Sequence, residues 1–368
     1  MKQFLLATTT LVSTLALTAP TMAQGTAAAD VSDQGLQDIV VTAQRKSESS
    51  QRAAVALDVV SGNDLQKAGV SSSSGLNAAV PSLYISKPGG SNTSYFIRGV
   101  GNFTNNSYTD PAIAFNVDGV YYGRPGSTIG AFFDLDRIEV LKGPQGTLYG
   151  RNATGGAINV ITAKPVPGEF SGRASLSYGN YDAVDAEAAI NVPLGQDGAL
   201  RVSGKLIDRD GYNDDGTSDE KGHALRVQML SNLTDTLTVR VIGDYSHVGG
   251  MGTGGTYTAN LNTTAGSVAT ATSPANYTIV ATGLAPRSGL LSPSNAALFA
   301  QRVIGGPRIN PGPLLAPYLD NDYYGASVEV TWKTDLGTLT ILPAVRTAKA
   351  RSSFNGPAFR GAPTSESS

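Results

Sequence analysis

The sequence contains no cysteine and only two histidines, His223 and His247. Without thiols the chain can form neither a disulfide framework nor a thiolate metal site, and two histidines leave little for a histidine-based one. Charged residues make up 15% of the chain, and the net charge of −2 gives no basic surface for nucleic acid. We therefore expect no nucleic-acid partner, no metal and no cofactor.

Long hydrophobic runs are missing after the N-terminus, so we expect no helix that spans a membrane. At the N-terminus itself, Lys2 precedes an apolar run from Phe4 to Leu17. Residues 21–23, Thr-Met-Ala, then place small side chains at the −3 and −1 positions of a cleavage site. This pattern predicts a secretory signal peptide over residues 1–23. A membrane anchor is the alternative, but the run is too short and too rich in threonine for it.

Residues 24–49 contain little to bury and are expected to form a flexible leader. Within them, DIVVTAQRK at 38–46 is a short β-prone run with a basic end. An exposed strand of this kind can pair with the edge of another protein's sheet. It could equally be the first strand of the following domain, and composition does not decide between the two.

Residues 50–166 are expected to form a compact domain of mixed α and β structure. Strands are expected at 57–62, 83–86, 95–100, 112–120, 137–143 and 156–165. A short helix is predicted over 63–69, between an N-cap at Asn63 and a glycine stop at Gly69, and another over 71–81, ended by Pro81.

From residue 167 to the end, the pattern becomes one of alternating apolar and polar residues. About seven strands are predicted, at 170–179, 183–193, 199–209, 222–233, 236–248, 323–333 and 337–349. One apolar and one polar face fit either a soluble β-sandwich or a membrane β-barrel. Tight turns at 193–198, 232–236 and 333–338 alternate with longer connections at 210–222 and 249–321. That alternation favours the barrel.

The stretch VLKGPQGTLYGRNATGGAINV, residues 140–160, has the composition of a phosphate-binding loop. In such a loop a lysine follows the glycines and a helix begins there, whereas Lys142 precedes the glycines and β-prone residues lie on both sides. The glycines are therefore expected to make tight turns between strands. Asp134, Asp136 and Glu139 are interpreted as loop and strand-end charges near Arg137. With no nucleophile and base in a recognisable set, we do not expect an enzyme.

Four motifs occur in order after the signal peptide: IVVTAQRK, YFIRGVG, FNVDGVYYGR and DLDRIEVLKGPQGTLYGRNATGGAINVITAKP. This series resembles the TonB-dependent outer-membrane receptors over about residues 38–166, and residues 169–349 resemble them only in texture. The resemblance implies an α+β plug domain followed by an antiparallel transmembrane β-barrel. The family's barrel has 22 strands, so about seven of them would be present here.

The resemblance also implies roles for particular residues. The TonB box, which pairs with the TonB energy-transducing protein and its inner-membrane motor, would be Asp38, Ile39, Val40, Val41, Thr42 and Ala43. Arg98 and Lys142 would lock the plug to barrel carboxylates that lie beyond Ser368. Loops 86–95 and 101–110 would form the plug apex, with the following residues facing the ligand: Tyr95, Phe103, Asn105, Asn106 and Tyr108.

The function implied by the resemblance is active transport across the outer membrane of a Gram-negative cell. The expected ligand is an iron–siderophore complex, and a carbohydrate, a vitamin B12-type compound or an aromatic compound are alternatives. A passive porin and a secreted adhesin are the competing classes. About fourteen residues separate Ala23 from the box, too few for the extra domain of signalling members, so we expect transport without transcriptional signalling.

Overall fold

The computed structural model describes residues 39–43, 45–46, 48–70, 75–89, 92–102, 110–123, 132–255, 259–263, 277–281, 283–285, 287–289 and 316–353. The predicted signal peptide, most of the predicted leader and Asp38 lie outside these residues. No helix in the described part of the chain is long and apolar enough to cross a membrane.

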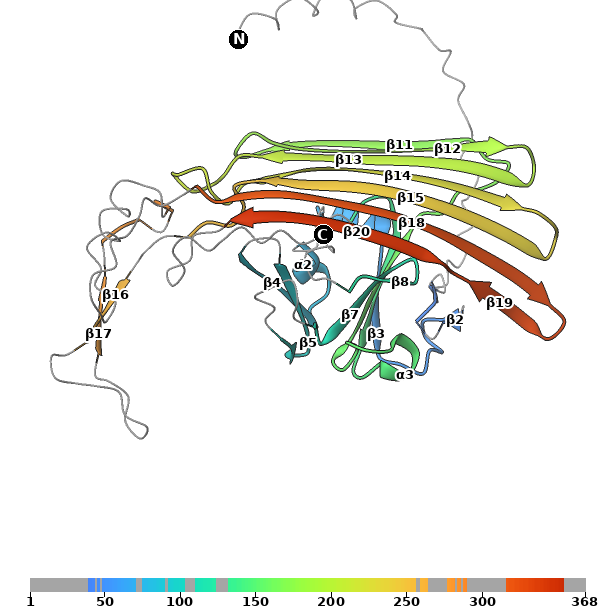
Figure 1. Ribbon diagram of the computed structural model, residues 1–368, viewed down its shortest axis with the longest axis horizontal. Coiled ribbons are helices and arrows are strands. Elements are labelled where there is room, and N and C mark those ends of the chain that lie inside the picture. The colour runs from blue at the N-terminus through green and yellow to red at the C-terminus, as the bar shows by residue number, and fades with distance from the viewer. Residues whose placement is uncertain are drawn as a thin grey trace, which may run out of the picture. The chain divides into compact units, whose positions relative to one another are not determined.

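The first region is built on a five-stranded sheet with the strand order β3-β9-β10-β7-β8. Figure 1 labels β3, β7 and β8 of this sheet. Its strands are β3 (Leu57–Ser61), β7 (Ile113–Val117), β8 (Val120–Tyr121), β9 (Leu135–Lys142) and β10 (Gly156–Thr162). β10 runs parallel to β7 and antiparallel to β9. Two smaller sheets accompany it: β1 (Val40–Val41) with β2 (Glu48–Ser49), and β4 (Leu83–Gly89), β5 (Asn92–Ile97) and β6 (Val100–Gly101).

Three short helices complete this region: α1 (Gly62–Lys67), α2 (Leu76–Ala79) and α3 (Gly146–Tyr149). The expected N-cap at Asn63 is wrong, because the helix begins one residue earlier and Ser61 caps it. The Ser61 hydroxyl accepts a hydrogen bond of 3.1 Å from the backbone N–H of Asp64, which satisfies a donor of the first turn.

Two apolar clusters of buried residues hold these sheets and helices together. The larger cluster includes Phe115, Ile138 and Ile158, from strands far apart in the chain, and the smaller one includes Leu141. The glycine-rich stretch contributes to the smaller cluster and links β9 to β10, with α3 as an unexpected single turn of helix within it. A Cβ atom at Gly156, where φ is +148°, would lie 2.3 Å from the Leu141 carbonyl oxygen, so glycine is required for packing rather than for binding phosphate.

The second region is an eight-stranded sheet, here called the wall. It comprises β11 (Ser171–Gly179), β12 (Ala183–Leu194), β13 (Gly198–Arg209), β14 (Glu220–Asn232), β15 (Leu237–Gly250), β18 (Tyr318–Thr334), β19 (Gly337–Ile341) and β20 (Ala344–Ser353). Neighbours are antiparallel, in the order β11-β12-β13-β14-β15-β18-β19, and β20 also pairs with β18.

The seven predicted wall strands are confirmed, with one change. The seventh is divided into β19 and β20 around Pro343, which has no N–H to donate to a strand ladder. The long 249–321 connection contains a hairpin that was not expected, β16 (Ala259–Thr263) with β17 (Tyr277–Ala281).

The two faces of the wall have opposite character. On the face toward the first region, polar side chains such as Arg226, Gln228 and Arg240 are almost completely buried. On the other face, apolar side chains such as Leu225 and Val227 remain exposed. Because successive residues of a strand point to opposite faces, one period-two pattern produces both.

Candidate functional site

The segment 39–43 lies folded onto the first region rather than standing free. Val41 and Ala43 are fully buried and pack with Ala114, Leu141, Ala153 and Ala157. Ile39 and Val40 remain about half exposed. β1 is also paired with β2, so the exposed strand considered from the sequence is occupied in this structure.

Polar contacts hold the same segment in place. The backbone N–H of Thr42 donates a hydrogen bond of 2.8 Å to the Glu139 carboxylate, which also accepts one of 2.9 Å from Arg137 Nε. The Tyr149 hydroxyl donates to the Ala43 carbonyl oxygen at 2.7 Å. Burial raises the pKa of Tyr149, so its hydroxyl stays a donor at neutral pH. We call these contacts the 39–43 seat.

The interpretation of the acidic residues as loop and strand-end charges is confirmed for Asp134 and Asp136 and is wrong for Glu139, which lies within β9. Glu139 is fully buried in the 39–43 seat, and Asp134 is buried between the two regions. Only Asp136 is exposed, where it pairs with Arg137. Sequence spacing could not distinguish them, because the burial of Asp134 and Glu139 depends on partners far away in the chain.

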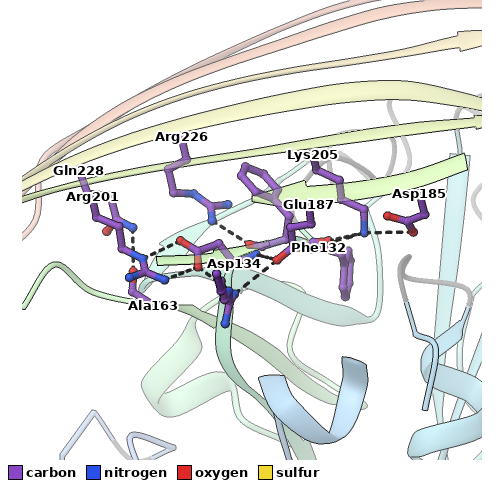
Figure 2. A network of polar contacts seen from close by, with 11 residues as sticks. Phe132, Asp134, Ala163, Asp185, Glu187, Arg201, Lys205, Arg226 and Gln228 are labelled. Carbon is purple, nitrogen blue, oxygen red and sulfur yellow. Dashed lines mark hydrogen bonds and ion pairs between the residues drawn. The ribbon is translucent and has the colours of Figure 1, made fainter. Parts of the chain in front are cut away.

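A second cluster joins the first region to the wall, and Figure 2 shows it. Asp134 accepts two hydrogen bonds from Arg201, from Nε at 2.8 Å and from the terminal nitrogen at 2.6 Å. Arg173 lies 2.8 Å from the same carboxylate. The backbone N–H of Asp134 in turn donates to the Glu187 carboxylate at 2.9 Å.

Backbone carbonyl groups of the first region meet further wall side chains. Arg226 donates to the Phe133 carbonyl oxygen at 2.9 Å, and its guanidinium lies 4.1 Å from the centre of the Phe133 ring. Gln228 donates to the Ala163 carbonyl oxygen at 2.9 Å (Figure 2). The polar face of the wall is thus the docking surface for the first region.

One further polar group lies where β15 ends and β18 begins. His247 Nδ1 is 3.1 Å from a carboxylate oxygen of Asp322 and 4.0 Å from one of Asp320. Such a set could hold a divalent cation. The Tyr245 hydroxyl also donates to Asp322 at 2.9 Å. Because the members already bind one another, we assign the group no role beyond cross-strand pairing.

Comparison with known proteins shows which family has this arrangement. The family model described as the TonB-dependent Receptor Plug Domain matches residues 49–157. The pesticin receptor of Yersinia pestis is 35% identical over 202 residues, which is 53% of this chain and 29% of that protein. An iron-regulated outer membrane virulence protein of Vibrio cholerae is 30% identical over 224 residues, or 57% of this chain and 32% of that protein.

The chain carries the plug domain of the TonB-dependent receptors at residues 49–157. Its first region is therefore the plug, its wall is part of the family's barrel, and its location is the Gram-negative outer membrane. The chain spans about a third of the length of the curated relatives it matches.

Solved receptor structures share the fold. The ferric yersiniabactin uptake receptor FyuA from Yersinia pestis aligns with a TM-score of 0.59 at 21% identity, over 82% of this chain and 42% of that one. The alcaligin receptor FauA from Bordetella pertussis aligns at 0.55 and 14% identity, over 85% of this chain and 42% of that one. At these identities the likeness concerns the fold alone.

The two residues expected to lock the plug are not brought together. Lys142 Nζ lies 2.5 Å from a carboxylate oxygen of Asp58, within the plug. Arg98 is exposed in the turn between β5 and β6, with φ at 51°. Their role in locking the plug stays a prediction.

The expected ligand-facing residues have different outcomes. Tyr95 is 4% exposed and its ring centre lies 5.5 Å from that of Phe115, so in this structure it is a plug core residue and does not face a ligand. Alternation within β5 turns it inward. Phe103, Asn105, Asn106 and Tyr108 lie outside the described residues.

Sequence reasoning missed the Asp134 cluster and the role of Glu139. The available indication was the set of charges in the middle of wall strands, such as Arg226 and Arg240. It showed that one face of the wall is polar, but it could not show which plug groups this face binds.

Proposed function

We propose that this protein is part of an active transporter that takes an iron–siderophore complex across the outer membrane, driven through residues 38–43 by the TonB protein. The observation that carries the proposal is the order of parts: a segment seated on a plug, followed by wall strands that bind the plug through their polar face. The name of one relative supports the ligand class, since the Vibrio cholerae protein is an iron-regulated outer membrane virulence protein.

The 39–43 seat defines what the proposed mechanism must accomplish. A partner can add a strand to this segment only where its backbone groups are free, and here one edge of β1 is paired with β2 and the Thr42 N–H is bound by Glu139. Ligand binding outside must therefore favour a state in which the seat opens. The partner then pulls on residues 38–43, and the plug shifts to open a path.

The ligand class is the least constrained part of the proposal. A carbohydrate, a vitamin B12-type compound or an aromatic compound would use the same plug and the same pull. Induction of the gene by iron starvation supports a siderophore, whereas induction by a carbon source contradicts it.

Deletion of residues 38–43 from the full-length receptor tests the mechanism. Uptake of radioactive iron is measured with a panel of hydroxamate, catecholate and phenolate siderophores as the probes. We expect uptake to fall to background while binding to the cell surface persists. Deletion of residues 25–30, six residues of the preceding leader, is the matched control and should leave uptake intact. Unchanged uptake of an imported siderophore without residues 38–43 would overturn the proposal.

A passive porin and a secreted adhesin remain the alternatives. A porin imports its solute without the energy-transducing partner, so uptake that survives loss of that partner would favour it. An adhesin would be recovered in the culture supernatant rather than in outer-membrane vesicles.

A further inference from the structure

Asp134 is a buried acid whose partners come from the other domain. It lies in the turn that leads into β9, with φ at 50°, and its side chain is inaccessible to solvent. Both carboxylate oxygens accept from Arg201, and Arg173 reaches one of them. A buried carboxylate persists as an ion only when it is fully paired. Two wall strands, β11 and β13, supply this pairing.

The backbone of the same turn is held by the same surface. Phe132 and Phe133 present their carbonyl oxygens to Lys205 and Arg226, at 3.4 and 2.9 Å. Consecutive plug residues 132–134 thus contact β11, β12, β13 and β14 (Figure 2). The two-pronged Arg201 contact fixes direction as well as distance, so it defines how this turn sits on the wall.

The other plug carboxylate at the wall is placed differently. Asp118 lies 3.6 Å from Arg240, but its oxygens already accept from the Thr162 N–H at 3.0 Å and the Thr162 hydroxyl at 2.6 Å. Arg240 in turn pairs with Glu329 at 2.6 Å. Each is thus satisfied within its own domain, whereas the Asp134 carboxylate is bound across the boundary.

We propose that Asp134 locks the plug to the barrel wall through Arg173 and Arg201. The charges are reversed relative to the arrangement expected for Arg98 and Lys142, since here the acid is on the plug and the cations are on the wall. The inference rests on the proposed function, because a lock matters only where the plug closes a transport barrel. Without the acid, Arg201 loses its two acceptor oxygens and Arg173 keeps only Glu187, and the plug seats loosely enough to admit solutes.

Leakage of a bulky hydrophilic antibiotic tests the lock without any ligand. Cells carrying the full-length receptor with Asp134→Ala are compared with wild type for susceptibility to vancomycin. We expect the inhibitory concentration to fall at least fourfold. Asp136→Asn is the matched control: it removes an exposed acid two residues away and should behave as wild type. Asp134→Glu keeps the charge. Its inhibitory concentration should lie at least halfway, on a logarithmic scale, from that of Asp134→Ala to that of wild type.

The wall side of the same contact provides the second set of variants. The double variant Arg173→Gln with Arg201→Gln should leak as much as Asp134→Ala. The triple variant that also carries Asp134→Asn should leak no more than the double variant. Outer-membrane amount and heat-modifiable migration are measured for each, and leakage is expressed per folded receptor. A purely structural role would lower the amount of receptor without raising leakage per molecule.

Wild-type leakage per folded receptor in either the Asp134→Ala or the arginine variants would overturn the lock, as would additive leakage in the combined variant. The assay needs neither ligand nor energy-transducing partner, so its outcome is separate from that of the proposed function. If uptake depends on residues 38–43 but the variants do not leak, only the proposed Asp134 lock is overturned. Leakage together with box-independent uptake would remove the transport mechanism alone.

Discussion

The plug and the wall use the same residue types in opposite places. In the plug, apolar side chains such as Ile158 and Phe115 are enclosed, and the buried charge of Glu139 is paired with Arg137 and Thr42. In the wall, Gln228 is fully buried, while Val227, the residue before it, is 39% exposed. The plug buries its apolar side chains, as water-soluble domains do, whereas the wall buries polar side chains and exposes apolar ones.

The difference teaches that each surface is matched to the medium it meets. An apolar face exposed over several neighbouring strands is costly in water but suits hydrocarbon, while a polar face suits another protein's backbone groups and charges. The wall therefore needs both a lipid environment and a plug. Substitutions in the wall and in the plug should therefore have different effects.

The largest expected effect is at the outer face of β14. Val227→Arg in the full-length receptor should destabilise the protein folded in phospholipid vesicles by about 2–4 kcal/mol, because the charge enters hydrocarbon near the middle of a strand. Urea-dependent unfolding measures this, and Val227→Leu is the control, expected within about 0.5 kcal/mol of wild type. Equal behaviour of the two variants would mean that this face does not meet lipid.

A smaller effect is expected at the 39–43 seat. Glu139→Gln removes the ionic partner of Arg137 and weakens the acceptor for the Thr42 N–H, at a cost of about 1–3 kcal/mol. The seat should then open more often. Since each 1.4 kcal/mol is about tenfold in an equilibrium, a cysteine introduced by Val41→Cys should react with a maleimide about 5–140 times faster in the Glu139→Gln protein.

These 368 residues contain no cysteine, so within them this labelling is specific to the seat. Asp136→Asn, which removes the exposed partner of Arg137, is the control and should leave the rate unchanged. An equal rate in the Glu139→Gln protein would show that the buried carboxylate does not hold the segment.

The smallest effect is a pH dependence within the plug. Burial alone would raise the pKa of Asp58, but hydrogen bonds from Lys142 and Ser82 outweigh it and hold that pKa below its ordinary value. The unfolded chain therefore binds more protons here, and the contribution is full above about pH 4 and is lost as pH falls through the folded pKa.

Asp58→Asn should accordingly cost stability at pH 6 and cost less at pH 3. The measurement is the difference in urea midpoint between wild type and variant at the two pH values. Lys142→Met should shift the dependence to higher pH, because the hydrogen bond and the nearby charge that lower the pKa are gone. A constant difference across this range would show that the Asp58–Lys142 pair does not contribute.

Much of the fold follows from local pattern. The wall strands could be placed within a few residues because period-two alternation is read along a single segment, and the change at Pro343 follows from one missing N–H. The N-cap at Ser61 was misplaced by two residues, since Ser61 and Asn63 are both good caps and only the geometry of the turn chooses between them.

The candidate sites follow only partly. Residues 39–43 could be singled out by composition, but their burial against Leu141 and Ala157 could not, because those positions are about a hundred residues away. Tyr95 was expected to face a ligand, and the pairing of β5 turned it into the core instead.

What the sequence determined by itself is the order of plug and wall, the strands, and the identity of the charged residues on each. Only the tertiary structure decided which charges meet. Asp134 and Asp136 are separated by a single residue, yet Asp134 is enclosed by Arg173 and Arg201 while Asp136 is exposed. The physical reason is that a charge is paired according to its neighbours in space, and strands β11 and β13 reach Asp134 only after the chain has folded back.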